Sequence, residues 1–125
     1  MSLNTNVESS TSGEPLLWED VCAIDDVLPG TGAAALVGGE QIAIVRTRSD
    51  ALYAISNFDP FSKAFVLARG IVGDRAGVPK IASPIYKQSF DLQTGQCLDD
   101  EGVRLPVYAA RVVAGRIQVA IPAVL

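Results

Sequence analysis

A series of short strand patterns, separated by turn residues, constrains the fold of this chain more than any other feature. Near its end, Ile117, Val119 and Ile121 alternate with Arg116, Gln118 and Ala120, which puts the three branched side chains on one face of a strand. Turn residues such as the Gly-Gly pair at 38–39 separate the patterns. This spacing predicts an all-β antiparallel sandwich or barrel. We expect strands at residues 16–22, 33–37, 41–48, 52–56, 89–92, 96–98, 108–113 and 116–121.

The helix signals are weak. Residues 18–27 offer one short amphipathic pattern, which Asp25, Asp26 and Pro29 would end early. Residues 62–69 are compatible with either a turn of helix or a short strand. The sequence therefore predicts no long helix in this fold.

The composition excludes several classes of site. The 125 residues are 49% hydrophobic, enough for one domain with a buried core. Histidine is absent, which rules out histidine acid–base catalysis, Ser–His or Cys–His nucleophile pairs and histidine-ligated metals. Cys22 and Cys97 are too few for a thiolate zinc site or a four-thiolate iron–sulfur cluster. We expect both cysteines to be reduced thiols inside the fold.

Charge and hydropathy argue against nucleic-acid and membrane partners. The net charge is −4, and no apolar run approaches the roughly 20 residues of a membrane-spanning helix. Residues 1–15 are rich in Ser, Thr and Asn, so we expect a disordered tail followed by one domain over residues 16–125. The first residues lack the charge and hydropathy pattern of a secretory signal, which favours the cytoplasm.

Residues 57–87 differ from the rest of the chain. The segment contains three prolines and three glycines, and residues 57–88 carry a net charge of +3 while the remainder carries −7. A long shaped excursion with its own charge is typical of a functional loop that attracts an acidic partner. The alternatives are a tolerated insertion and a solvated loop. The candidate partner-binding cations are Lys63, Arg69, Arg75, Lys80 and Lys87.

Phenylalanines in the same segment are candidate apolar anchors for a partner. Phe58, Phe61 and Phe65 lie close together in the sequence. The alternative is that they fill the core beneath the loops.

Two stretches of this segment resemble a known family. NFDPFSKAFVLARGIVGD and KIASPIYKQSFDLQTG are similar to the small subunit of assimilatory NAD(P)H-dependent nitrite reductase, and the resemblance covers about residues 16–121. It implies a Rieske-like ferredoxin fold with two projecting loops. In true Rieske proteins these loops hold a [2Fe–2S] cluster through two Cys and two His.

The resemblance also shows that the cluster ligands are missing. The C-x-H motif falls on Asn57 and Asp59, and the C-x-x-H motif falls on Ser83 and Tyr86. Oxygen side chains do not replace thiolates and imidazoles on a soft iron–sulfide cluster. We therefore expect no metal or cofactor in this chain and no active site of its own. The four residues are expected to brace the loops, with Tyr86 packing across the gap that a cluster would leave. A ligand pocket at this tip is the alternative.

The resemblance implies an accessory function. A small subunit of this family docks on a large catalytic subunit that carries FAD, sirohaem and an iron–sulfur cluster and reduces nitrite to ammonium with NAD(P)H. No GxGxxG dinucleotide motif is present in this chain. The alternatives are a Rieske-type electron-transfer protein of another oxidoreductase and a stand-alone ligand-binding β domain.

Overall fold

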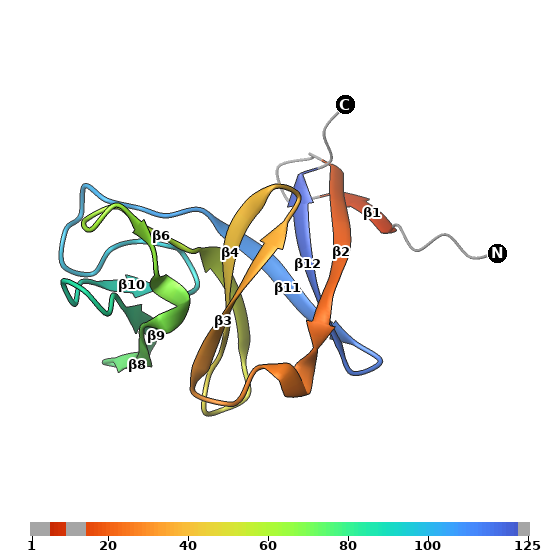
Figure 1. The fold of residues 1–125 in the computed structure, drawn as a ribbon, viewed down its shortest axis with the longest axis horizontal. Coiled ribbons are helices and arrows are strands. Elements are labelled where there is room, and N and C mark those ends of the chain that lie inside the picture. Colours follow the sequence, from red (N-terminus) through yellow and green to blue (C-terminus); the bar gives the residue numbers. More distant parts are fainter. Residues whose placement is uncertain (1–5, 10–14, 123–125) are drawn as a thin grey trace.

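Seven strands form one curled antiparallel sheet (Figure 1). The computed structural model describes residues 6–9 and 15–122. The spatial order is β1-β2-β12-β11-β5-β4-β3, with all neighbours antiparallel. The bounds are β1 Asn6–Ser9, β2 Pro15–Ala23, β3 Thr31–Val37, β4 Glu40–Arg46, β5 Leu52–Ser56, β11 Val107–Val113 and β12 Arg116–Pro122.

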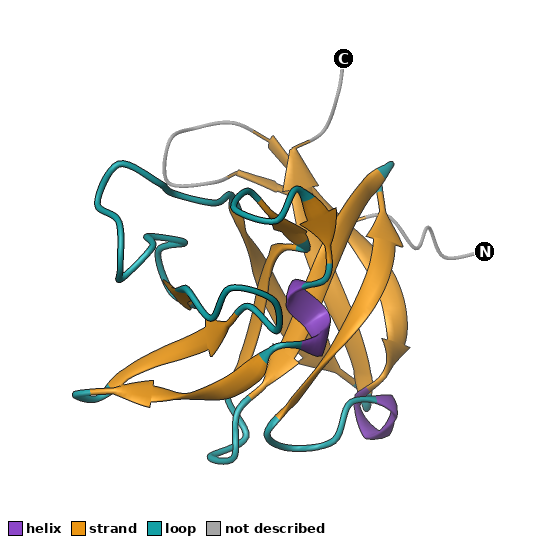
Figure 2. Cartoon of the chain, turned by 60° about the vertical axis from the view of Figure 1, so that its left-hand side comes forward, coloured by secondary structure: helices purple, strands orange, loops and turns teal. Residues whose placement is uncertain are grey.

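The residues between β5 and β11 build a second lobe beside this sheet. It contains a β6–β7 pair and a three-stranded sheet of order β10-β9-β8 (Figure 1). Figure 2 shows that many of the loops gather on this side of the molecule. The bounds are β6 Phe58–Asp59, β7 Ala64–Phe65, β8 Ile71–Arg75, β9 Val78–Ala82 and β10 Ser89–Asp91, with short 3₁₀ turns η1 at Ile24–Asp26 and η2 at Leu67–Arg69.

Strand β4 lies between two hydrophobic clusters. Ile42 and Ile44 belong to the cluster inside the curled sheet, and Ala43 and Val45 belong to the cluster between the two lobes. Successive side chains of a strand point to opposite faces, so one apolar strand serves both cores. Each large side chain buried in this way contributes about 1.5–3 kcal/mol. The inter-lobe cluster fixes the second lobe and its loops against the main sheet.

The structure confirms the all-β fold and most of the expected strands. The weak helix pattern at 18–27 instead continues β2 and ends in η1. Residues 96–98 form no strand; Gln96 and Cys97 make only isolated bridges. Part of the excursion is strand rather than loop, because β8 and β9 pair there despite their Gly and Pro residues.

The expected N-terminal tail is described only in part. Residues 6–9 form β1, which pairs with the start of β2, so these four residues are paired at the sheet edge. Residues 1–5 and 10–14 lie outside the described residues, and the boundary at residue 16 stays a prediction. Within residues 6–9 and 15–122, no helix is long and apolar enough to cross a membrane.

Candidate functional site

Asn57 fixes the start of the first projecting loop. It directly follows β5, and its side chain is buried. Its Oδ1 accepts a hydrogen bond from the Ala68 backbone N–H at 2.7 Å, and its carbonyl accepts one from Leu67 at 3.2 Å. Both donors lie in η2. Asn57 therefore ties the beginning of the loop to its end through a bond that spans 11 residues, rather than through the local backbone contact expected from the sequence.

Asp59 is the centre of the first loop. Its side chain is fully buried. Oδ1 accepts a hydrogen bond from the Phe61 N–H at 3.0 Å, and Oδ2 accepts from the hydroxyls of Ser62 at 2.7 Å and Ser83 at 2.6 Å. Burial alone would raise the pKa of Asp59, but these hydrogen bonds outweigh burial and leave the pKa below its ordinary value. Asp59 is therefore a buried carboxylate held ionised by neutral donors.

Ser83 holds the second loop to the first. Its buried hydroxyl donates to Asp59 and accepts a hydrogen bond from the Ile85 N–H at 3.2 Å. Its backbone N–H donates to the Gln88 carbonyl at 2.8 Å, and its carbonyl accepts from the Lys87 N–H at 3.1 Å. Through these contacts Ser83 both closes its own turn and joins the two loops.

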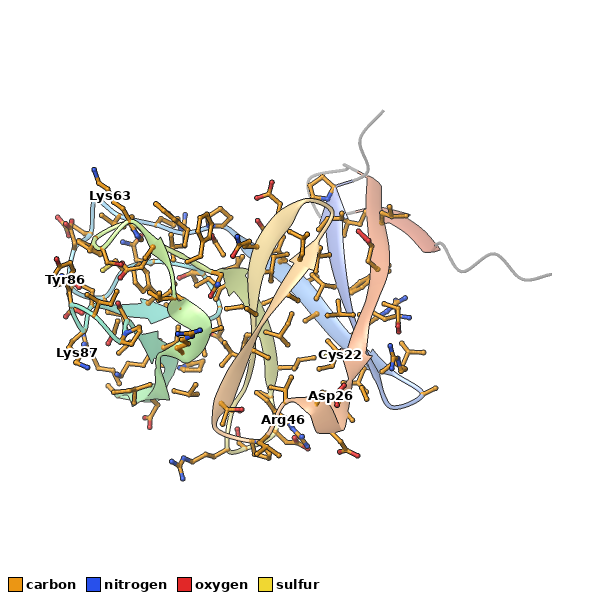
Figure 3. The ribbon with its side chains drawn as sticks, viewed as in Figure 1. Cys22, Asp26, Arg46, Lys63, Tyr86 and Lys87 are labelled. Carbon is orange, nitrogen blue, oxygen red and sulfur yellow. The ribbon has the colours of Figure 1, made fainter. Side chains whose placement is uncertain are left out.

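Tyr86 does not have the position that its expected bracing role requires. It is 60% exposed, and Figure 3 shows Tyr86 at the outer end of the second lobe, the end that also holds Lys63 and Lys87. The reason is local: Tyr86 lies in the turn between Ser83 and Lys87, whose backbone hydrogen bond directs the intervening side chains outward. Tyr86 is part of the surface and not of the internal brace.

The residues at the four ligand positions do not fit a [2Fe–2S] cluster. Asn57, Asp59 and Ser83 offer oxygen donors, and each uses its side-chain oxygen in hydrogen bonds within the protein. A Rieske cluster needs thiolate sulfur and imidazole nitrogen. Among residues 6–9 and 15–122, no group of three or more His, Cys, Asp or Glu side chains is arranged to hold a metal ion.

The two cysteines lie outside these loops. Cys97 is buried and Cys22 is half-buried, and both are free thiols, as expected. Burial, and secondarily the charge of Asp26, raises the pKa of the Cys22 thiol.

The predicted apolar anchors have different surroundings. Phe61 packs against the inter-lobe core, with its ring centroid 6.2 Å from that of Phe90. Phe58 is half-buried, and its ring lies 5.2 Å from that of Phe65. Phe65 itself is 53% exposed. Phe61 is therefore a core residue, which agrees with the alternative that the phenylalanines fill the core beneath the loops. The ring of Phe65 is exposed.

The predicted cations also separate into two groups. Lys63, Arg69 and Lys87 are exposed. Arg75 pairs with Asp99 at 3.2 Å, and the half-buried Lys80 donates to the Ser89 hydroxyl at 3.2 Å. Arg75 and Lys80 therefore have contacts within the chain that account for their positions. A role of any of these residues in partner binding stays a prediction.

Sequence reasoning missed one apolar residue of this end of the molecule. Ile85 is 46% exposed beside Tyr86, in the turn of the second loop. The Ser-Pro pair at 83–84 was a signal for that turn. In that turn the Ile85 N–H donates to the Ser83 hydroxyl at 3.2 Å, and the side chain is left at the surface.

The comparisons with known proteins agree on one family. The model of the Rieske-like [2Fe-2S] domain family matches residues 17–120. The NADH nitrite reductase small subunit of Salmonella typhimurium is 50% identical over 102 residues, which cover 81% of this chain and 94% of the relative. The crystal structure of a Mycobacterium tuberculosis protein described as an NADH-dependent nitrite reductase small subunit is 50% identical, with a TM-score of 0.83 over 87% of this chain and 98% of that one.

A further match lies inside a longer protein. The NAD(P)H nitrite reductase large subunit of Klebsiella oxytoca is 35% identical over 114 residues. These residues cover 88% of this chain but only 12% of the large subunit. A domain similar to this chain is thus part of a large-subunit polypeptide.

Proposed function

Since this chain belongs to the Rieske-like [2Fe-2S] domain family, as a nitrite reductase small subunit, we propose that it docks on a large catalytic subunit and brings no redox centre of its own. The chain is non-catalytic in this proposal. Its partner carries out the NADH-dependent reduction of nitrite to ammonium. Because NADH is a cytoplasmic reductant, the assembly works in the cytoplasm.

The hydrogen bond between Ser83 and Asp59 supports this proposal most directly. Both side chains are fully buried and lie at positions where a Rieske protein would have cluster ligands. A pair of oxygen side chains that satisfy each other keeps the two loops together without a metal. In this proposal the loop architecture is kept without electron-transfer chemistry, and its use is molecular recognition.

The redox chemistry belongs to the partner. The family resemblance assigns FAD, sirohaem and an iron–sulfur cluster to the large subunit. These groups provide a path from NADH to nitrite that does not pass through this chain. The similar domain within the Klebsiella oxytoca large subunit supports a lasting association between the two parts.

Co-expression tests the proposal. An affinity-tagged form of this chain is expressed with the large subunit from the same genome, and the eluate is separated by gel filtration. We expect the two polypeptides to elute together with NADH-dependent nitrite reductase activity. The large subunit expressed without the tagged chain is the control for non-specific retention. Separate elution of two folded proteins would contradict the proposal.

A further inference from the structure

We propose that one end of the second lobe is the surface that docks on the large subunit. It binds an apolar patch of the large subunit that is rimmed by carboxylates. We call it the tip surface; it consists of Lys63, Phe65, Ile85, Tyr86 and Lys87. The inference rests on the proposed function, and it names the contact residues and the chemistry of the partner surface. It replaces the broader set of 57–87 contacts expected from the sequence.

The two lysines occupy equivalent positions on the two loops. The Asp59 carbonyl accepts a hydrogen bond from the Lys63 N–H at 2.7 Å, and the Ser83 carbonyl accepts one from the Lys87 N–H at 3.1 Å. The side chains of Asp59 and Ser83 are themselves hydrogen-bonded. Each lysine therefore closes a turn that begins at one member of the buried pair. Figure 3 shows both lysines at this end of the molecule.

Both lysines have a backbone conformation that favours glycine. The φ angle is 59° at Lys63 and 69° at Lys87. Residues with a Cβ are destabilised in this left-handed region, whereas glycine is not. Asp50, Ala76 and Ala114 have the same conformation in turns elsewhere, so a positive φ alone does not mark a site. Backbone geometry therefore does not explain the lysines, although Lys87 Nζ donates one hydrogen bond to the Pro84 carbonyl at 3.1 Å.

Three large apolar side chains are exposed on the same loops. Phe65, Ile85 and Tyr86 have 53%, 46% and 60% of their surface exposed. Phe65 pairs with Phe58 in the β6–β7 ladder of the first loop, and Ile85 donates its N–H to the Ser83 hydroxyl in the turn of the second loop. Exposed aromatic side chains held by a rigid scaffold lose little entropy on binding and are enriched in interfaces.

The charge of the tip surface indicates the chemistry of the large-subunit surface that binds it. The loops carry net positive charge in a chain whose overall charge is −4. In the acidic run at residues 99–101, Asp99 is paired with Arg75, while Asp100 and Glu101 are exposed. Two lysines at the rim of an apolar centre are complementary to carboxylates around an apolar patch. A second copy of the chain would bring lysines against lysines, so a tip-to-tip dimer is disfavoured.

The first experiment removes the charges without adding strain. The double variant Lys63→Gly and Lys87→Gly relieves both strained φ angles, so its melting temperature should not fall. Its association rate with the large subunit should fall about tenfold at low ionic strength, and the difference should shrink in high salt. Ala76 and Ala114, with φ angles of 52° and 51° in hairpin turns outside the tip, provide the matched glycine control. That control should associate at the wild-type rate.

The second experiment removes the apolar contacts. Ile85→Ser and Tyr86→Ser should each speed dissociation of the complex about fivefold or more, because buried interface side chains act mainly on the dissociation rate. Val112→Ser and Val113→Ser are the controls, since these β11 residues are 47% and 44% exposed. Faster dissociation of the β11 variants, with unchanged tip variants, would overturn the inference. A tip-dependent dimer of the isolated chain would also overturn it.

The two proposals fail in different ways. If the wild-type chain does not bind the large subunit at all, the proposed function is wrong. If the wild-type complex forms and all tip variants bind with wild-type kinetics, the function stands and the tip surface is not the interface.

Discussion

The Ser83 hydroxyl donates a 2.6 Å hydrogen bond to Oδ2 of Asp59 and joins two loops 24 residues apart in the sequence. The two side chains are fully buried. A carboxylate in such a site is stable only when several donors satisfy it, and Phe61 and Ser62 provide the others. The brace between the loops is thus a single buried ionised group that accepts hydrogen bonds from Phe61, Ser62 and Ser83.

Removal of the Ser83 hydroxyl, which donates a hydrogen bond to Asp59, should destabilise the fold. Ser83→Ala leaves the buried Asp59 carboxylate with an unfilled acceptor site, so we expect a loss of about 1.5–3 kcal/mol in the free energy of unfolding. Urea unfolding measures this loss. Asp74→Asn is the matched control, because this exposed carboxylate accepts a hydrogen bond from Gly77 in a surface turn; its effect should stay within about 0.5 kcal/mol. Equal effects of the two substitutions would contradict the brace.

Low pH should remove the contribution of the ionised Asp59 side chain to the free energy of unfolding. Because folding lowers the pKa of Asp59, the ionised carboxylate stabilises the protein above its ordinary pKa of 3.8, and this stabilisation is lost as the pH falls through the lower folded-state value. The difference in unfolding free energy between wild type and Asp59→Asn should therefore be constant near neutral pH and shrink below about pH 4. A difference that grows on acidification would show the opposite sign of the pKa shift.

Gly95 should tolerate alanine poorly. Its φ angle is +82°, and an added Cβ would overlap the Leu105 carbonyl oxygen, which is backbone and has little room to move. We expect Gly95→Ala to cost about 2–5 kcal/mol, from backbone strain and overpacking together. Gly115→Ala has a similar φ of +77° but meets no neighbouring atom, so it should cost only about 1–2 kcal/mol. Thermal unfolding of the two variants distinguishes these costs.

The two thiols should react slowly in the native protein. Cys97 is buried, and burial together with the Asp26 charge raises the pKa of Cys22, which lowers its thiolate fraction. We expect a disulfide reagent to label Cys22 slowly and Cys97 only after unfolding. Denaturant provides the control in which both thiols react at once. Rapid native labelling of Cys97 would contradict its buried position.

The sequence predicted the main sheet better than the second lobe. Alternation along β12 and the Gly-Gly turn before β4 are local signals, and the structure confirms both. Strand β9 was missed because it contains Pro79, and proline is rare in a central strand. There the pairing with β8 and β10 outweighs local propensity.

The positions of the candidate site residues were predictable from the sequence, but the contacts between them were not. The family resemblance assigned Asn57, Asp59 and Ser83 to the loops, and the absence of His and of paired Cys followed from composition. The hydrogen bond between Asp59 and Ser83 depends on tertiary packing of the second lobe, so no local pattern indicated it. Tyr86 lies in the turn that the Lys87 N–H and the Ser83 carbonyl close, and its exposure there is why its expected packing was wrong.

Iron analysis after anaerobic cluster reconstitution tests the central claim most directly, namely that Asp59 and Ser83 hold the loops in place of a cluster. The wild-type chain is incubated with iron and sulfide, desalted and assayed for iron and for visible absorbance. We expect a colourless protein with iron far below one atom per chain. Two iron atoms per chain with Rieske-type absorbance would contradict it.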